Sequence, residues 1–268
     1  MFAVNGAVRL AYDDLGPPGG EPILMLMGLA ASRFWWPPGL LTALQAEGFR
    51  PIVLDVRDSG ESTRATVQYS AEDLTDDVIA VADHLGLADA HLFGLSFGSV
   101  VAQRVALRHP DRVRTLTGYA AGSSDAGLAK VVLRYFRWGT QLRLGRLTRR
   151  AGSDEELAVA IMAVAGYPGG GDFARTTVAR DREHGIRSFR DVSAQGRQIR
   201  ARWHGPRLRE MRVPALVLHG EADRLLRDRA ARDIAAAVPG ARLMILPGAG
   251  HVPPPDSWAT IARAMRDI

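Results

Sequence analysis

Three residues that lie far apart in the sequence, Ser96, Asp223 and His251, have the types that nucleophilic catalysis requires. A serine hydroxyl is a weak nucleophile near neutral pH and needs a base to accept its proton. Histidine suits this role because it titrates near neutral pH, and a carboxylate can orient its ring and stabilise the imidazolium. Glycines two residues before and two residues after Ser96 allow a sharp turn that exposes the hydroxyl. The set predicts acyl transfer through a serine nucleophile.

The histidine and the acid are chosen by their positions after strands. His251 lies in a glycine-rich loop after the last predicted strand, whereas His219 is expected to be a turn residue beside the end of the preceding one. Asp223 follows that preceding strand after a short turn. Both side chains are therefore expected at the carboxyl edge of a parallel sheet. Three other carboxylates remain alternatives for the acid: Glu221, Asp228 and Asp125.

Backbone donors and aromatic side chains near these residues complete the predicted site. The developing oxyanion needs hydrogen-bond donors, and the backbone N–H of Phe97, directly after the nucleophile, is one candidate. The N–H of Leu29, in the loop after an early strand, is the second. Beyond that loop, Trp35 and Trp36 are candidates to line an apolar acyl site, and Trp138 is a candidate for its roof. Burial in the core is an equally good explanation for each tryptophan.

Strands and helices alternate on both sides of the candidate residues. The apolar run 90–93 predicts a buried strand, and apolar residues at helical spacing after Ser96 predict a helix. Further strands are predicted at 2–4, 8–13, 22–27, 51–55, 113–119, 215–218 and 242–246. Further helices are predicted at 40–47, 71–85, 227–237 and 257–268, the second capped by Ser70 with Asp73. This alternation predicts an α/β fold with a mostly parallel central sheet and helices on both faces.

The alternation stops between residues 124 and 210, where only helical patterns and glycine-rich loops occur. We therefore predict a core made of residues 1–123 and 211–268. Residues 124–210 are predicted to form an α-helical cap that is inserted between two core strands. Such a cap is expected over the carboxyl edge of the sheet, where α/β proteins bind their ligands.

The composition limits the classes of function. The 268 residues are 47% hydrophobic and 24% charged, as in ordinary globular proteins. The absence of cysteine excludes disulfides, a thiol nucleophile and cysteine-ligated metals. No apolar stretch approaches the roughly 20 residues that span a bilayer, and the N-terminus does not look like a secretory signal. A cytoplasmic location without a membrane partner is therefore expected.

Positive charge is concentrated in the predicted cap. Residues 124–210 contain 16 arginines and one lysine against nine acidic residues, while the whole chain has a net charge of +5. The arginines are scattered at helical intervals without a recognisable nucleic-acid module, so nucleic acid is not an expected partner. A solvated helical surface is the expected explanation, and attraction of anionic substrates is the alternative.

Taken together, the motifs resemble those of the α/β-hydrolase fold superfamily over essentially the whole chain. The matching segments are 26–29, 54–62, 94–98, 218–223 and 248–251. Many members have His-Gly where this chain has Met27-Gly28, a difference that leaves the backbone donor at Leu29 in place. The resemblance implies the α/β-hydrolase fold, and the order Ser96, Asp223, His251 is the order described for nucleophile-elbow hydrolases. Segments 27–29 and 57–63 are also similar to esterases of the aclacinomycin-methylesterase type, which act on bacterial polyketides.

The expected reaction is hydrolysis of a carboxylic ester or lactone of a small, largely apolar molecule through an acyl-enzyme on Ser96. No metal or organic cofactor is expected, and the expected partner is the small-molecule ester. The same residues also support thioesterase, carbon–carbon bond hydrolase and perhydrolase chemistry. A ligand-sensing receptor with slow turnover is an alternative from a different class. The oligomeric state does not follow from the sequence.

Overall fold

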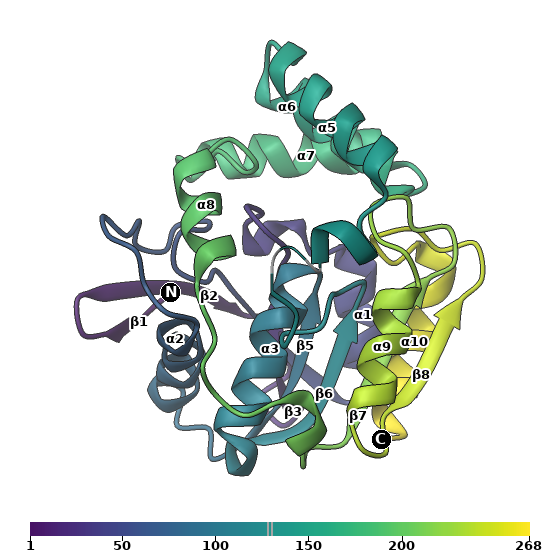
Figure 1. Cartoon of the computed structure of the whole chain (residues 1–268). Coiled ribbons are helices and arrows are strands. Elements are labelled where there is room, and N and C mark those ends of the chain that lie inside the picture. Colours follow the sequence, from purple (N-terminus) through teal and green to yellow (C-terminus); the bar gives the residue numbers. More distant parts are fainter. Residues whose placement is uncertain (128, 130) are drawn as a thin grey trace.

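The computed structural model describes residues 1–127, 129 and 131–268. The strands within them are β1 (Phe2–Asn5), β2 (Val8–Asp14), β3 (Glu21–Leu26), β4 (Phe49–Leu54), β5 (Ala90–Leu95), β6 (Val113–Tyr119), β7 (Ala215–Gly220) and β8 (Arg242–Leu246). They form one sheet in the order β1-β2-β4-β3-β5-β6-β7-β8 (Figure 1). In this order, β1 pairs with β2 and β2 with β4 in antiparallel fashion. All the other neighbouring pairs, from β4–β3 to β7–β8, are parallel. The structure confirms the predicted mostly parallel α/β sheet.

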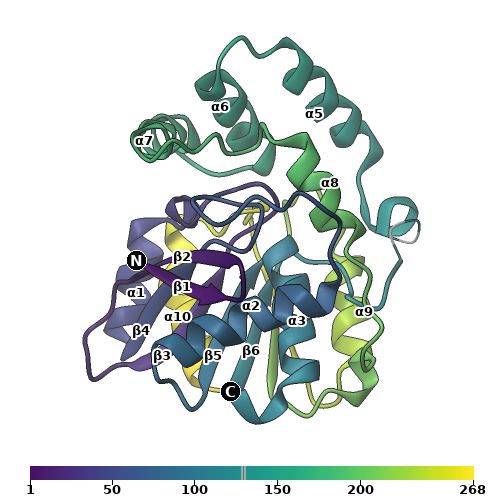
Figure 2. The same ribbon diagram turned by 90° about the vertical axis from the view of Figure 1, so that its left-hand side faces the viewer.

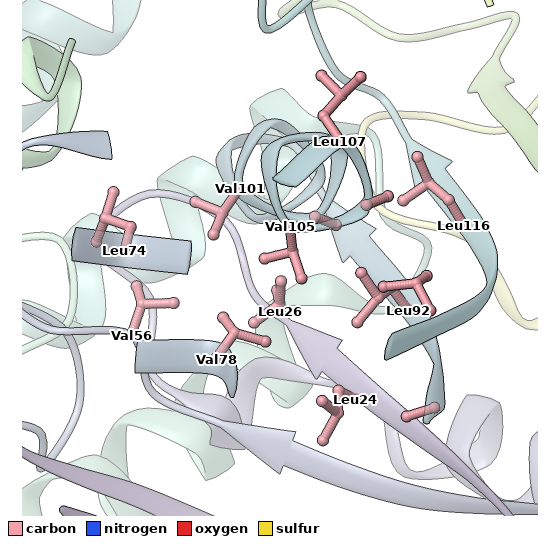
Figure 3. Close-up of a cluster of buried hydrophobic side chains, with 14 of the residues drawn as sticks. Leu24, Leu26, Val56, Leu74, Val78, Leu92, Val101, Val105, Leu107 and Leu116 are labelled. Carbon is pink, nitrogen blue, oxygen red and sulfur yellow. The ribbon is translucent and has the colours of Figure 1, made fainter. Parts of the chain in front are cut away.

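Helices cover both faces of the sheet. One face carries α2 (Ala71–His84), α3 (Phe97–Arg108) and α9 (Arg229–Ala237), and the other carries α1 (Pro38–Ala46) and α10 (Trp258–Arg266). In β3, Leu24 and Leu26 pack on the first face, whereas Ile23 and Met25 pack on the second. Successive side chains of a strand point to opposite faces, so a strand buried on both sides is a continuous apolar run. Figure 3 shows the cluster between β3, α2 and α3.

In the described part of the chain, four α-helices lie between β6 and β7, above the carboxyl ends of the parallel strands (Figures 1 and 2). They are α5 (Trp138–Arg150), α6 (Asp154–Ala165), α7 (Gly170–Glu183) and α8 (Val192–Arg200). We refer to these four helices and their connections as the cap. The exact cap boundaries, 124 and 210, remain a prediction. Ala201 and Leu208, which follow α8, are buried in the core cluster that packs on α3.

Local sequence signals account for several helix ends. The Ser70 side chain accepts a hydrogen bond from the Asp73 N–H, and the Asp73 carboxylate accepts one from the Ser70 N–H, which confirms the predicted capping box of α2. In the cap, the Ser153 hydroxyl accepts from the Glu156 N–H at the start of α6, and Gly166 ends that helix with φ of 73°. No described helix has the length and apolar character needed to cross a membrane.

Candidate active site

Ser96 lies at the turn between β5 and α3 with φ of 53° and ψ of −116°. A non-glycine residue rarely adopts a positive φ, and such strain is held in place by the surrounding structure. The Ser96 N–H donates to the carbonyl of Tyr119 in β6 at 2.8 Å. A Cβ on Gly98 would collide with the carbonyl oxygen of Leu26 in β3, and one on Gly94 would collide with the backbone of α3. The two glycines are required because α3 starts directly against the sheet, which leaves the Ser96 hydroxyl at the helix N-terminus.

His251 and Asp223 meet above the carboxyl ends of β7 and β8. The distance from His251 Nδ1 to Asp223 Oδ2 is 2.8 Å. The other carboxylate oxygen accepts hydrogen bonds from the N–H groups of Leu225 at 2.7 Å and Leu226 at 3.0 Å. The backbone N–H of His251 donates to the carbonyl of Ala165 in α6 at 2.7 Å. With Nδ1 donating its proton to the carboxylate, Nε2 is left as a base.

The environment of Asp223 keeps it ionised. Burial opposes ionisation, but the charge of His251 and the hydrogen bonds from His251 and Leu226 outweigh it and hold the pKa of Asp223 below its ordinary value. His219 lies inside β7 rather than in the expected turn, and its Nε2 is 3.7 Å from Asp223 Oδ2. Burial lowers the pKa of His219, and neither of its ring nitrogens has a hydrogen-bond partner among the described residues. His219 is therefore a buried imidazole beside the Asp223 carboxylate, and its lowered pKa favours the neutral form.

The three alternative acids are engaged elsewhere. Glu221 accepts from a loop N–H, Asp228 pairs with a neighbouring arginine on α9, and Asp125 accepts from the backbone of the segment after α8. In the described part of the chain, Asp223 is the carboxylate that contacts His251. The hydrogen bond to His251 therefore distinguishes Asp223 from the three alternative acids.

Ser96 and His251 line the same cavity. Among the described contacts, no hydrogen bond joins the Ser96 hydroxyl to the imidazole. Hydrogen bonds between catalytic groups are often long or misaligned in ligand-free enzymes and tighten when substrate binds. The observed arrangement thus brings all three residues to one site without the serine–histidine hydrogen bond formed.

The two candidate oxyanion donors belong to residues beside the nucleophile. Gly28 packs against Ser96, since a Cβ at Gly28 would lie 3.5 Å from the Ser96 Cβ. The next residue, Leu29, lines the cavity and is the first central residue of a tight turn, in which Ala30 is left-handed with φ of 63°. Phe97 is the first residue of α3 and is not among the residues that line the cavity. Neither the Leu29 N–H nor the Phe97 N–H donates to another described residue, so both donors are free to bind an oxyanion.

The cavity above Ser96 has a volume of about 310 Å³ and an apolar wall. Its wall includes side chains of Leu144, Ile161, Phe173 and Phe189 from the cap. The described lining residues with a hydroxyl, imidazole or amide side chain are Ser96, His251, Thr148 and Gln195. No charged side chain is present among the described lining residues. The cavity therefore suits a small, uncharged and largely apolar ligand.

The aromatic candidates divide between the cavity and the rest of the molecule. Trp35 lines the cavity, as does Phe136. Trp36 does not line the cavity. It follows the 3₁₀ segment Arg33–Trp35 with an extended backbone, and its buried ring packs on Phe93 of β5. Trp138 lies outside the cavity and is 46% exposed. It is six residues from Leu144 in α5, which places the two on different sides of the helix.

Sequence reasoning missed two phenylalanines that line the cavity, Phe173 and Phe189. Phe173 lies in α7, and Phe189 lies in the connection to α8. Both pack edge-on against Trp35, with ring centroids 5.8 and 4.9 Å away. An isolated aromatic residue in a predicted helix or loop gives no local signal that it faces a cavity.

A family model described as alpha/beta hydrolase fold matches residues 21–257. The chain belongs to this family. The match begins at β3 and extends past His251, so it includes the elbow serine, the acid and the histidine. The superfamily resemblance seen in the sequence motifs is thereby confirmed.

Individual relatives of this hydrolase differ in the reactions that their names describe. Rhodomycin D methylesterase DnrP of Streptomyces peucetius is 36% identical over 124 residues, which span 45% of this chain and 42% of that protein. A 2-hydroxymuconate semialdehyde hydrolase of Pseudomonas putida is 27% identical over 256 residues, covering 92% of this chain and 84% of that protein. Among solved structures, the enol-lactonase of Burkholderia xenovorans LB400 superposes with a TM-score of 0.73 at 24% identity, covering 100% of this chain and 97% of that one. The likeness to the methylesterase thus extends over less than half of either protein, and the structural likeness shows the fold alone.

Proposed function

We propose that this hydrolase cleaves a carboxylic ester of a small, uncharged and largely apolar molecule through an acyl-enzyme on Ser96. The main support for this proposal is the hydrogen bond between His251 Nδ1 and Asp223 Oδ2, because His251 and Ser96 line the same cavity. Similarity to DnrP favours a methyl ester as the group that is cleaved.

The proposed mechanism uses five groups of this chain. Ser96 Oγ attacks the ester carbonyl carbon while His251 Nε2 accepts its proton, and Asp223 stabilises the imidazolium. The N–H groups of Leu29 and Phe97 bind the oxyanion of the tetrahedral intermediate. His251 then protonates the departing alcohol. A water molecule, deprotonated by the same imidazole, attacks the acyl-enzyme and releases the acid and Ser96.

The uncharged lining favours neutral esters over carbon–carbon bond cleavage of a substrate that carries a carboxylate. The relative from Pseudomonas putida is named for 2-hydroxymuconate semialdehyde, a molecule that carries a carboxylate. A carboxylate transferred into this cavity would meet no cationic partner among the described lining residues. Burying an unpaired carboxylate costs at least several kcal/mol. The alternative that the basic cap draws in anionic substrates is disfavoured for the same reason.

The test compares Ser96→Ala with wild type on methyl benzoate and on its 4-carboxylate, monomethyl terephthalate. Wild type is expected to hydrolyse the neutral ester over many cycles, with kcat/KM at least about tenfold higher than for the charged one. Ser96→Ala is expected to remove turnover with an unchanged Tm. Ser193→Ala, which changes an exposed serine on α8, is the matched control. Retained turnover in Ser96→Ala refutes the nucleophile, and turnover limited to a few cycles in wild type supports the receptor alternative.

A further inference from the structure

A buried acid of the cap contacts the segment that follows the Leu29 donor. Asp181, in α7, is 2% exposed. Its two carboxylate oxygens accept separate hydrogen bonds, one from the Ser32 hydroxyl at 2.6 Å and one from the Trp35 indole N–H at 3.0 Å. Ser32 is fully buried, and its hydroxyl also accepts from the Phe34 N–H at the start of the 3₁₀ segment. Asp181 thus binds the segment at two points within four residues.

The connection after α7 adds two hydrogen bonds to the same segment. The Ser32 N–H donates to the hydroxyl of Ser188 at 3.2 Å, and the Phe189 N–H donates to the carbonyl of Ala30 at 2.8 Å. Ala30 and Phe189 both have left-handed backbones, with φ of 63° and 68°. Residues with side chains disfavour this conformation, which persists only where surrounding contacts fix it. Two strained residues therefore meet across one hydrogen bond.

The position of Leu29 makes these contacts relevant to catalysis. Leu29 and Ala30 are the central residues of a turn closed by the Ala31 N–H and the Gly28 carbonyl at 3.3 Å. The direction of the Leu29 N–H depends on this turn, and the hydrogen bond from Phe189 fixes the carbonyl of its second central residue. Trp35, whose ring lines the cavity, is held by Asp181 in the same cluster.

The chemistry of Asp181 suits this double contact. Asparagine has one acceptor oxygen, so it could accept from Ser32 or from Trp35 but would present an NH₂ group to the other donor. A carboxylate accepts from both. No ion pair of Asp181 with a cation occurs among the described residues, so its burial depends on these two neutral donors.

We propose that Asp181 is a positioning residue through which the cap fixes the Leu29 oxyanion donor. This inference rests on the proposed function, because it assigns Asp181 a role in the same acyl transfer. It makes the cap part of the transition-state site as well as a cover for the substrate. We call the contacts of Asp181, Ser188 and Phe189 with residues 30–35 the clamp. An acyl group that displaces Trp35 or Phe189 is expected to lower kcat by moving the Leu29 donor, so the clamp also selects for acyl size.

The experiment measures kcat, KM and Tm with p-nitrophenyl butyrate for Asp181→Asn, Ser32→Ala and wild type. Phenylboronic acid supplies a second readout, because its tetrahedral adduct on a serine hydroxyl places an oxygen at the oxyanion position. Loss of one oxyanion donor costs about a hundredfold to a thousandfold in kcat, so a displaced donor is expected to cost about tenfold. Asp172→Asn, which changes a 90% exposed aspartate of the same helix, is the matched control.

Asp181→Asn and Ser32→Ala are each expected to lower kcat about tenfold and to raise the boronate Ki by a similar factor, while KM changes less than about twofold. The double variant is expected to lose no more than the stronger single variant, because both changes release the same segment. If Asp181→Asn does not fold, Ser32→Ala decides. A rise in KM with unchanged kcat and boronate Ki overturns the positioning role and leaves Asp181 as a wall support. If the wild-type protein neither hydrolyses the ester nor binds the boronate, the proposed function is refuted, and the clamp with it. If the wild type is active and the variants have unchanged kcat and boronate Ki, the clamp alone is refuted.

Discussion

Replacing Arg197 by methionine removes the cation that joins α8 to the core. The Nε and Nη2 atoms of Arg197 donate to the two carboxylate oxygens of Asp58 at 2.8 and 2.9 Å. The Asp58 side chain is fully buried, and it also accepts a hydrogen bond from the Ala65 N–H at 2.9 Å. In Arg197→Met the carboxylate loses its cation in an enclosed site, where the neutral Ala65 N–H and the neighbouring Tyr69 hydroxyl remain. Because α8 carries the cavity residues Val192 and Gln195, the same change loosens one wall of the cavity.

The expected cost follows from this geometry. Removing one partner of a buried ion pair costs about 3–5 kcal/mol. The Arg197 side chain is 16% exposed, so water reaches part of the pair, and we expect about 3 kcal/mol for Arg197→Met. Asp58 also has a left-handed backbone with φ of 68°, a strain that glycine would relieve by about 1 kcal/mol. The double variant Arg197→Met/Asp58→Gly removes the orphaned charge and the strain, so its stability is expected within about 1 kcal/mol of wild type.

Urea unfolding followed by tryptophan fluorescence measures these differences. Arg64→Met is the matched control, because Arg64 also joins the core to the start of α8, through Asp191 at 3.4 Å, but both side chains are more than one-third exposed. That exposed pair is expected to contribute less than about 1 kcal/mol. If Arg197→Met costs no more than Arg64→Met, or if adding Asp58→Gly does not restore stability, the buried carboxylate is not the source of the loss.

Three further predictions concern the site itself. Asp223→Asn is expected to lower kcat by a factor of about 10⁴ without unfolding, because the amide no longer holds the His251 Nδ1–H. Glu221→Gln should change kcat little. Steady-state kinetics on one neutral ester tests both variants. Burial lowers the pKa of His219, so the unfolded chain binds a proton first as the pH falls, and stability should decrease below about pH 6.5. His219→Asn should flatten this decrease in urea unfolding between pH 7 and 5, and an unchanged slope would contradict the assignment. Leu144→Trp should lower kcat/KM for bulky aromatic esters more than for acetates, and an equal effect on both would place residue 144 outside the acyl-binding space.

The sheet and the placing of Ser96, Asp223 and His251 at one edge were predictable because each depends on a local signal and one topological rule. Glycines around Ser96 predicted the elbow, and the structure shows the steric reason in the approach of α3 to β3. Asp223 and His251 were predicted from their places after parallel strands, whose carboxyl ends meet at one edge. The rule does not by itself distinguish Asp223 from Asp125, which also follows a strand. The hydrogen bond to His251 makes that distinction.

The lining of the cavity was harder to predict because it depends on how helices of the cap are rotated. Trp35 and Trp36 are adjacent and chemically equivalent, yet one faces the cavity and the other is buried under the site. Trp138 is apolar and lies in the cap, but its side of α5 faces solvent. Hydrophobicity identifies residues that avoid water, whereas the choice between core, cavity and exposed surface is made by tertiary packing.

Two buried carboxylates explain why the cap is held more firmly on one side than on the other. Asp181 of α7 accepts hydrogen bonds from the core, and Asp58 of the core accepts them from Arg197 of α8. In sequence, both acids lie beside arginines and are indistinguishable from solvated charges. By contrast, no described side chain of α5 is fully buried, although Leu144 and Thr148 of this helix line the cavity. Since α7 and α8 are fixed to the core by buried hydrogen bonds, we expect α5 to move at a lower cost in free energy than these two helices. Substrate bulk directed towards α5 should therefore be tolerated, whereas bulk directed towards Trp35 and Phe189 should disturb the Leu29 donor and slow the acyl transfer itself.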